Sequence, residues 1–148
     1  MRVDLNADLG EEITDDSGLL QVVTSANVAC GFHAGNDSTM RMVCEQAADL
    51  GVVVGAQVSY RDRAGFGRRP MEVAPETLTA WVSEQISQLV QAAESAGTVV
   101  AYVKPHGALY NRIVHDPEQA RAVLTGSGSL PVMGLPGSAF LQLATEQG

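Results

Sequence analysis

The sequence is poor in cysteine, in positive charge and in long apolar runs, and each shortage excludes a class of protein. Its two cysteines, Cys30 and Cys44, form no C-x-x-C motif, so we predict neither a zinc site nor a dithiol and expect reduced thiols. Nine Lys and Arg residues oppose 17 Asp and Glu residues, and the net charge of −8 argues against binding to nucleic acid. No apolar run approaches the roughly 20 residues that cross a bilayer, and the acidic N-terminus is unlike a signal peptide. We therefore expect a cytoplasmic protein with no membrane or nucleic-acid partner.

What is present is the composition of one globular domain, arranged as alternating strands and helices. The chain has 148 residues, of which 45% are hydrophobic, and no linker divides it. Short apolar runs typical of buried parallel strands alternate with helical patterns that carry caps. We predict strands at 3–5, 26–30, 52–56, 98–103 and 131–135, and helices that begin near 37, 75, 117 and 140 and end before the glycines at 51, 97, 126 and 148.

Five βα units suit either an open doubly wound sheet or part of a β/α barrel. The G-x-G-x-x-G turn that a dinucleotide-binding doubly wound fold carries after its first strand is absent, so we predict the α/β class with a β/α-barrel-like fold. A complete barrel typically needs roughly 250 residues, so this chain supplies only about five of its eight units. The prediction is a single β/α domain over 1–148 that lacks the C-terminal part of the barrel. Its open edge near Leu135 is expected to pair with another copy or another polypeptide.

Unusual polar residues follow four of the predicted strands. In a parallel α/β fold the loops after the strands converge on one face, where such folds build active sites. Lys104 is the only lysine of the chain, and His33 and His106 lie in the same loops, whereas His115 is expected at the surface. Together these segments predict one site. Its candidate residues are Asn6 and Asp8 after the first strand, Asn27 and His33 from the second, Gln57 from the third, and Lys104, His106, Tyr110 and Asn111 after the fourth.

The loop 61–69 contains four of the eight arginines of an acidic protein. A guanidinium cluster suits a carboxylate or phosphate, because its forked donors match those oxygens, and Arg68 is the candidate for binding such an anion. For Arg61 and Arg63 we prefer the alternative, which is surface ion pairs with Asp62 and Glu72.

Asp8, His33 and His106 could bind a divalent metal, since carboxylate and imidazole are ordinary ligands. The sequence has no H-x-x-x-H or H-E-x-x-H spacing, so we prefer the alternative that these residues are metal-free acid and base groups. The acidic pair at 11 and 12 is typical of solvated charge at a helix start. Cys30 is interpreted as a small buried residue rather than as a nucleophile.

Four strings of the sequence resemble one protein family. They are D-L-N-A-D-L-G-E at 4–11, S-A-N-V-A-C-G-F-H-A-G at 25–35, G-F-G-R-R at 65–69 and K-P-H-G-A-L-Y-N at 104–111. In this order they are similar to the LamB/YcsF family of 5-oxoprolinase A subunits. The resemblance implies a β/α-barrel-like fold related to polysaccharide deacetylases, of the glycoside hydrolase/deacetylase type. It also implies a part in the ATP-dependent opening of 5-oxoproline to L-glutamate with subunits B and C, to which ATP activation is usually attributed.

The chain departs from the family's pattern at two motifs. Where the family often has G-A-H-P, this chain has G-A-Q-V, so Gln57, which cannot titrate, replaces a histidine. The first motif continues G-E-E-I-T-D-D rather than G-E-G-F-G, which leaves the role of Glu12 open. The family also continues past position 148.

The preferred function is therefore hydrolysis of a lactam by one component of an ATP-using complex. Asp8 is the candidate base for water, His106 the candidate acid for the leaving nitrogen, and Lys104 a fixed positive charge. The alternatives are a metal-dependent, deacetylase-like hydrolase and a non-catalytic binding or regulatory subunit. The predicted substrate-binding residues are Asn6, Asn27, His33, Gln57, Arg68, Tyr110 and Asn111.

Overall fold

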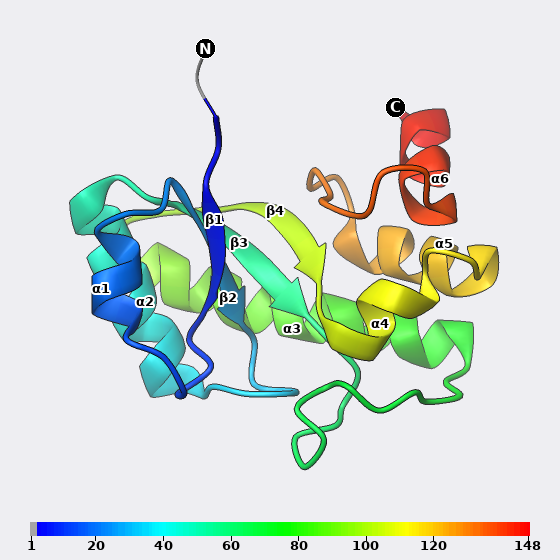
Figure 1. The fold of residues 1–148 in the computed structure, drawn as a ribbon, viewed down its shortest axis with the longest axis horizontal. Coiled ribbons are helices and arrows are strands. Elements are labelled where there is room, and N and C mark those ends of the chain that lie inside the picture. Colours follow the sequence, from blue (N-terminus) through cyan, green and yellow to red (C-terminus); the bar gives the residue numbers. More distant parts are fainter. Residues whose placement is uncertain (1–2) are drawn as a thin grey trace.

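The computed structural model describes residues 3–148, which form one parallel sheet flanked by helices (Figure 1). Each neighbouring pair of strands is parallel, and the strand order follows the chain, β1-β2-β3-β4. A doubly wound sheet reverses its strand order at a switch point, whereas a barrel adds its strands in sequence. The predicted α/β class is confirmed, and the strand order is that of a barrel. The strands are β1 (Asn6–Leu9), β2 (Ser25–Ala29), β3 (Val53–Val58) and β4 (Val100–Pro105).

The first three helices of the chain connect the four strands, the other three follow the last strand, and helices cover one face of the sheet. α2 and α3 pack against it, and Val54, Ala56 and Val58, which alternate along β3, belong to the apolar core. In the described part of the chain, no helix is long and apolar enough to cross a membrane. The helices are α1 (Asp16–Leu20), α2 (Asp37–Leu50), α3 (Pro75–Ser95), α4 (Gly107–Arg112), α5 (Pro117–Ser127) and α6 (Ala139–Gln147).

Most ends of the longer helices follow the signals in the sequence, but α5 continues through Gly126, before which its end was predicted, to Ser127. Pro75 begins α3, and the Asp116 side chain caps α5, both as predicted. The sequence predicts Asp37 or Ser38 as the N-cap of α2, but the N-cap is Asn36, whose side-chain oxygen accepts a hydrogen bond from the backbone N–H of Thr39 at 3.1 Å. The short helices α1 and α4 were not predicted, since five or six residues carry no clear helical period.

Two predicted strands are corrected by the structure. The first strand begins at Asn6 rather than at residue 3, and Leu5, which the prediction placed inside it, is 54% exposed. The segment 131–135 is not a strand and contributes one isolated parallel bridge between Val103 and Val132. Pro131 offers no N–H, and a proline at 136 closes the segment, so the ladder stops after this bridge.

Gly107 allows the chain to enter α4 directly after β4. Its φ is +59°, in the left-handed region, and a Cβ there would collide with the carbonyl oxygen of Gly67. The N–H of Ala108 donates to that same carbonyl at 2.9 Å. The start of α4 and the loop around Gly67 therefore hold each other in place, and His106, the N-cap of α4, lies against Gly67 directly after β4.

We expect Gly107→Ala to lower the free energy of unfolding by about 3 kcal/mol, combining the left-handed penalty with overpacking. Gly97→Ala is the matched control, because Gly97 has φ +77° but a Cβ added there would meet no atom within 4 Å. The control should cost only about 1 kcal/mol, the left-handed penalty alone. Urea unfolding of both variants measures the difference, and equal losses would show that the Gly67 contact is not tight.

Candidate functional site

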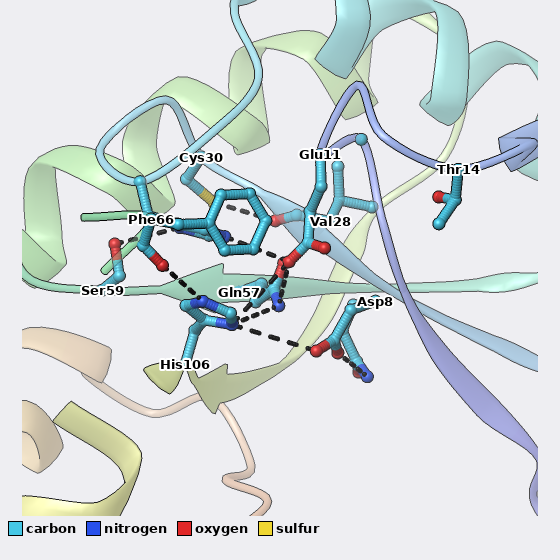
Figure 2. A network of polar contacts seen from close by, with 12 residues as sticks. Asp8, Glu11, Thr14, Val28, Cys30, Gln57, Ser59, Phe66 and His106 are labelled. Carbon is cyan, nitrogen blue, oxygen red and sulfur yellow. Dashed lines mark hydrogen bonds and ion pairs between the residues drawn. The ribbon is translucent and has the colours of Figure 1, made fainter. Parts of the chain in front are cut away.

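A buried group of polar side chains lies at the carboxyl ends of the strands (Figure 2). Oε1 of Glu11 is 3.3 Å from Nε2 of His33, and Nδ1 of the same ring is 3.0 Å from Oγ of Ser59. These side chains come from segments that follow different strands, and the parallel sheet brings them together. We call Glu11, His33, Gln57 and His106 the buried cluster, since each is at most 8% exposed.

Gln57 joins the two halves of the buried cluster. Its Nε2 lies 3.0 Å from Oε1 of Glu11 and 2.9 Å from Nδ1 of His106. The amide nitrogen can only donate, so Nδ1 of His106 accepts, and the hydrogen of a neutral His106 is on Nε2. That Nε2 donates to the carbonyl oxygen of Phe66 at 3.0 Å. The basic nitrogen of His106 therefore points into the cluster.

The two imidazole rings pack face to face beneath Phe66. The rings of His33 and His106 are stacked with their centroids 4.0 Å apart, and the Phe66 ring lies edge-on to both at 5.4 and 5.5 Å. Phe66 itself has a φ of +56°, a conformation that is rare for a bulky residue and often marks functional sites. The loop 61–69 thus covers the cluster.

Burial and charge set the protonation of the cluster. Burial raises the pKa of Glu11, but hydrogen bonds from His33 and Gln57 outweigh it, so the pKa lies below its ordinary value and the carboxylate stays charged. Burial lowers the pKa of His33, and the nearby His106 lowers it further, against the opposing effect of Glu11. The resting cluster therefore combines one carboxylate with a neutral His33.

The free energy of unfolding is expected to decrease as the pH falls below about 6.5, the ordinary pKa of histidine. The folded-state pKa of His33 is lower than this, so the unfolded chain binds a proton that the folded chain does not. A second decrease should follow below about pH 4, where unfolded carboxylates take up protons but Asp8 and Glu11 in the folded chain remain charged. Urea unfolding of His33→Gln should lack the first decrease, whereas the exposed His115→Gln should retain it. A free energy that stays flat from about pH 8 to 5 would contradict this account.

A second, more open group lies beside the cluster and centres on the ion pair between Asp8 and Lys104. Nζ of Lys104 is 2.7 Å from Oδ1 of Asp8, and Oδ2 of Asp8 is 3.9 Å from Nδ1 of His106. Burial raises the pKa of Asp8, but His106 and Lys104 lower it by more, so the pKa lies well below its usual range. The Tyr110 ring centroid is 5.9 Å from Nζ. This group carries a fixed ammonium and a carboxylate that is a weak base.

The predicted site residues fall into two places. Eight of them belong to the buried cluster or the Asp8–Lys104 pair or lie beside them, but Arg68 and Asn111 line a separate cavity of about 610 Å³ between the loop 66–71 and helices α4 and α5. The Arg68 guanidinium lies 5.1 Å from the centroid of the Phe66 ring. Within residues 3–148, Arg68 has no ion pair, so the cavity offers a free cation.

The other arginines of the loop 61–69 are engaged in ion pairs, which was the preferred alternative for two of them. Their partners differ from those predicted, because Glu72 pairs with Arg112 at 3.0 Å instead. The pairs are Arg61 with Glu84 at 3.0 Å, Arg63 with Glu12 at 3.3 Å and Arg69 with Asp62 at 3.9 Å.

Glu11 is a member of the buried cluster that the sequence interpretation missed. It was expected to be solvated, but it is 8% exposed and contacts both histidines. Gly10, with φ +72°, turns the chain sharply after β1 and directs Glu11 inward. A glycine between a strand and an acidic residue was the available signal.

The structure also changes the candidate metal ligands. The predicted set was Asp8, His33 and His106, but Asp8 is committed to Lys104. Glu11, His33 and His106 each offer one ligand atom, and these atoms all lie within 4.8 Å of one another. One carboxylate oxygen and two imidazole nitrogens are a donor set that fits Zn²⁺ or a similar divalent cation.

Cys30 does not have the properties of a nucleophile. It is fully buried, and burial raises the pKa of its thiol far above the ordinary value. Its Sγ lies 3.2 Å from the carbonyl oxygen of Val28, which accepts its weak hydrogen bond. Cys30 therefore fills the core, as preferred from the sequence.

Comparison with known proteins gives a consistent result. The proteins of Streptomyces avermitilis and Streptomyces coelicolor that are named as the A subunit of 5-oxoprolinase are each 63% identical to the chain, over 99% of it and 62% of their own length. The chain thus spans less than two thirds of these curated relatives. A crystal structure of a lactam utilization protein from Thermus thermophilus matches with a TM-score of 0.95 at 39% identity, over 99% of this chain and 63% of that one, which confirms the predicted fold class. Residues 3–148 match the LamB/YcsF family, so the chain belongs to that family.

Proposed function

We propose that the chain is part of the A subunit of a cytoplasmic 5-oxoprolinase, which opens 5-oxoproline to L-glutamate by hydrolysing its lactam bond. The observation that carries the proposal is a charged carboxylate and a basic imidazole nitrogen next to a fixed ammonium, all at the strand ends. The names of the Streptomyces and Thermus relatives support the choice of a lactam as substrate. Subunits B and C are the proposed partners.

Lactam hydrolysis needs a base for water, a positive charge for the oxyanion and a proton for the leaving nitrogen. Nδ1 of His106 is the proposed base, and the ring then returns the proton to the nitrogen. Glu11, 3.8 Å away, stabilises the imidazolium formed in between. Lys104 faces the oxyanion or the substrate carboxylate. The low pKa of Asp8 makes it a poor base, so it is assigned to holding Lys104 rather than to the proton transfer first expected of it.

Gln57 is proposed to contact the substrate through its side-chain oxygen. In the described part of the chain, its Oε1 is the buried side-chain oxygen or nitrogen atom that has no hydrogen-bond partner. A buried acceptor without a donor is costly. The N–H of a lactam is a donor of the required kind, which supports a role for Gln57 in substrate binding.

ATP is proposed to act on the partner subunits. The sequence has no glycine-rich phosphate loop, and three of the four arginines in the loop 61–69 are held in ion pairs. These features support placing ATP on the partner subunits, and none of the steps proposed for this chain passes through it.

The test is release of glutamate from 5-oxoproline in the presence of ATP and all three subunits. Release is expected only when the family's full-length A chain is included with B and C. Equal release by B and C alone would overturn the proposal.

A second candidate is a metal-dependent hydrolase, favoured by the donor set of Glu11, His33 and His106. A bound divalent cation would polarise the carbonyl and lower the pKa of a bound water. Chelation of metal ions distinguishes the two candidate functions. Loss of activity on chelation, with recovery on adding Zn²⁺ or Mn²⁺, favours the metal-dependent reaction, and insensitivity to chelator excludes it.

A further inference from the structure

One row of residues crosses all four strands, and it ends at the ion pair. Asp8 on β1 pairs in register with Asn27 on β2, Asn27 with Gly55 on β3, and Gly55 with Tyr102 on β4. The missing side chain at Gly55 leaves room for the Tyr102 ring, because a Cβ there would collide with it. The Tyr102 hydroxyl thereby crosses β3 and reaches Asn27 at 2.6 Å.

The amide of Asn27 is fully used by protein groups. Its Oδ1 accepts from Tyr102, and its Nδ2 donates to Oδ1 of Asn6 at 2.9 Å and to Oδ1 of Asp8 at 3.0 Å. Burial raises the pKa of Tyr102, so its hydroxyl remains a donor and fixes the orientation of the amide. Asn27 is 0% exposed, so no atom of it is free for substrate.

Asp8 connects the fixed amide of Asn27 to the ammonium of Lys104 by hydrogen bonds. The same oxygen, Oδ1 of Asp8, accepts from Asn27 and from Nζ of Lys104. A lysine has a long, flexible stem, so the place of its ammonium depends on what holds the far end. An ammonium has three hydrogens, and Asp8 uses one of those on Nζ, which leaves the others for a substrate.

We propose that Tyr102 and Asn27 are positioning residues, which hold the Asp8 carboxylate and through it the Lys104 ammonium at one point of the site. This replaces the substrate-binding role first expected of Asn27. The positioning is a property of the chain itself, and only its consequence for catalysis rests on the proposed function.

The single lysine makes the positioning directly measurable. An acetylating reagent at trace level labels Lys104 and the α-amino group, and peptide mapping by mass spectrometry separates the two. The rate at Lys104 is expected to rise in Asp8→Asn, where the partner charge is lost. In Tyr102→Phe it should rise about threefold to tenfold, the effect of one buried hydrogen bond. Tyr60→Phe is the matched control, because Tyr60 is also a buried tyrosine but its hydroxyl contacts Gln119, and its rate should equal that of the wild type.

Two outcomes of the labelling would overturn the proposal. An unchanged rate in Tyr102→Phe, with a raised rate in Asp8→Asn, would show that Tyr102 does not act on Lys104. An unchanged rate in Asp8→Asn would show that the ion pair itself does not restrain the amine. Neither result depends on any activity of the complex.

A second measurement tests the consequence for catalysis with the three-subunit complex and 5-oxoproline. Tyr102→Phe should lower kcat by about threefold to tenfold in the wild-type background and have no further effect in Lys104→Met, because a residue that acts through Lys104 couples to it. Additive losses in the double variant would overturn the positioning role. A wild-type complex that releases no glutamate would instead contradict the proposed function, while the labelling result would stand.

Discussion

Replacing Glu11 with glutamine is expected to lower glutamate release by the three-subunit enzyme by about a thousandfold, within the range of acid–base groups. Oε1 of Glu11 lies 3.3 Å from His33 and 3.8 Å from His106, so its charge stabilises any proton that His106 takes from water. Glutamine has nearly the same shape but no charge. A single-turnover rate at saturating 5-oxoproline measures the chemical step.

Glu12→Gln provides the control for this variant. Glu12 is the next residue in the chain, but its side chain is 40% exposed and pairs with Arg63 outside the buried cluster. Its substitution should change the rate by less than about threefold, as expected for an exposed ion pair. If Glu11→Gln also retains the full rate, the chain is a binding or regulatory subunit rather than a catalytic one.

Lys104→Met is expected to reduce turnover by about a hundredfold, the usual loss when one preorganised charge in a site is removed. The methionine stem occupies much of the same space, so the fold should be kept, which thermal unfolding followed by circular dichroism can verify. The matched control is Arg121→Met, which removes an exposed positive charge on α5 and should leave turnover unchanged. Wild-type turnover in Lys104→Met would exclude Lys104 from charge stabilisation.

The architecture could be predicted because its signals are local. The apolar positions of α2 and α3 recur at helical spacing, and proline and glycine mark where these helices begin and end. The short apolar runs between these helices are typical of buried parallel strands. The prediction of a fifth strand at 131–135 was wrong, because it gave more weight to the apolar residues of this segment than to the prolines at 131 and 136, which limit strand pairing.

The candidate site was only partly predictable, because burial and register are not local. His33 and His106 were identified from their place after strands, and they do meet. Glu11 was expected to be solvated, because the acidic pair itself does not show which member turns inward, and the signal of the preceding Gly10 was not used. The hydrogen bond between Asn27 and Tyr102 could not be predicted, because it depends on how β2, β3 and β4 align.

Because the Tyr102 ring crosses β3 over Gly55, the residues at positions 55 and 102 constrain each other in evolution. Any side chain gained at position 55 would displace the ring, and a small residue at position 102 would leave a hole above Gly55. Substitutions at these two positions should therefore arise as pairs in related sequences. A lineage that gains a side chain at position 55 would lose the hydrogen bond from Tyr102 to Asn27 and would need another donor for it. Residue 27 should therefore change together with positions 55 and 102.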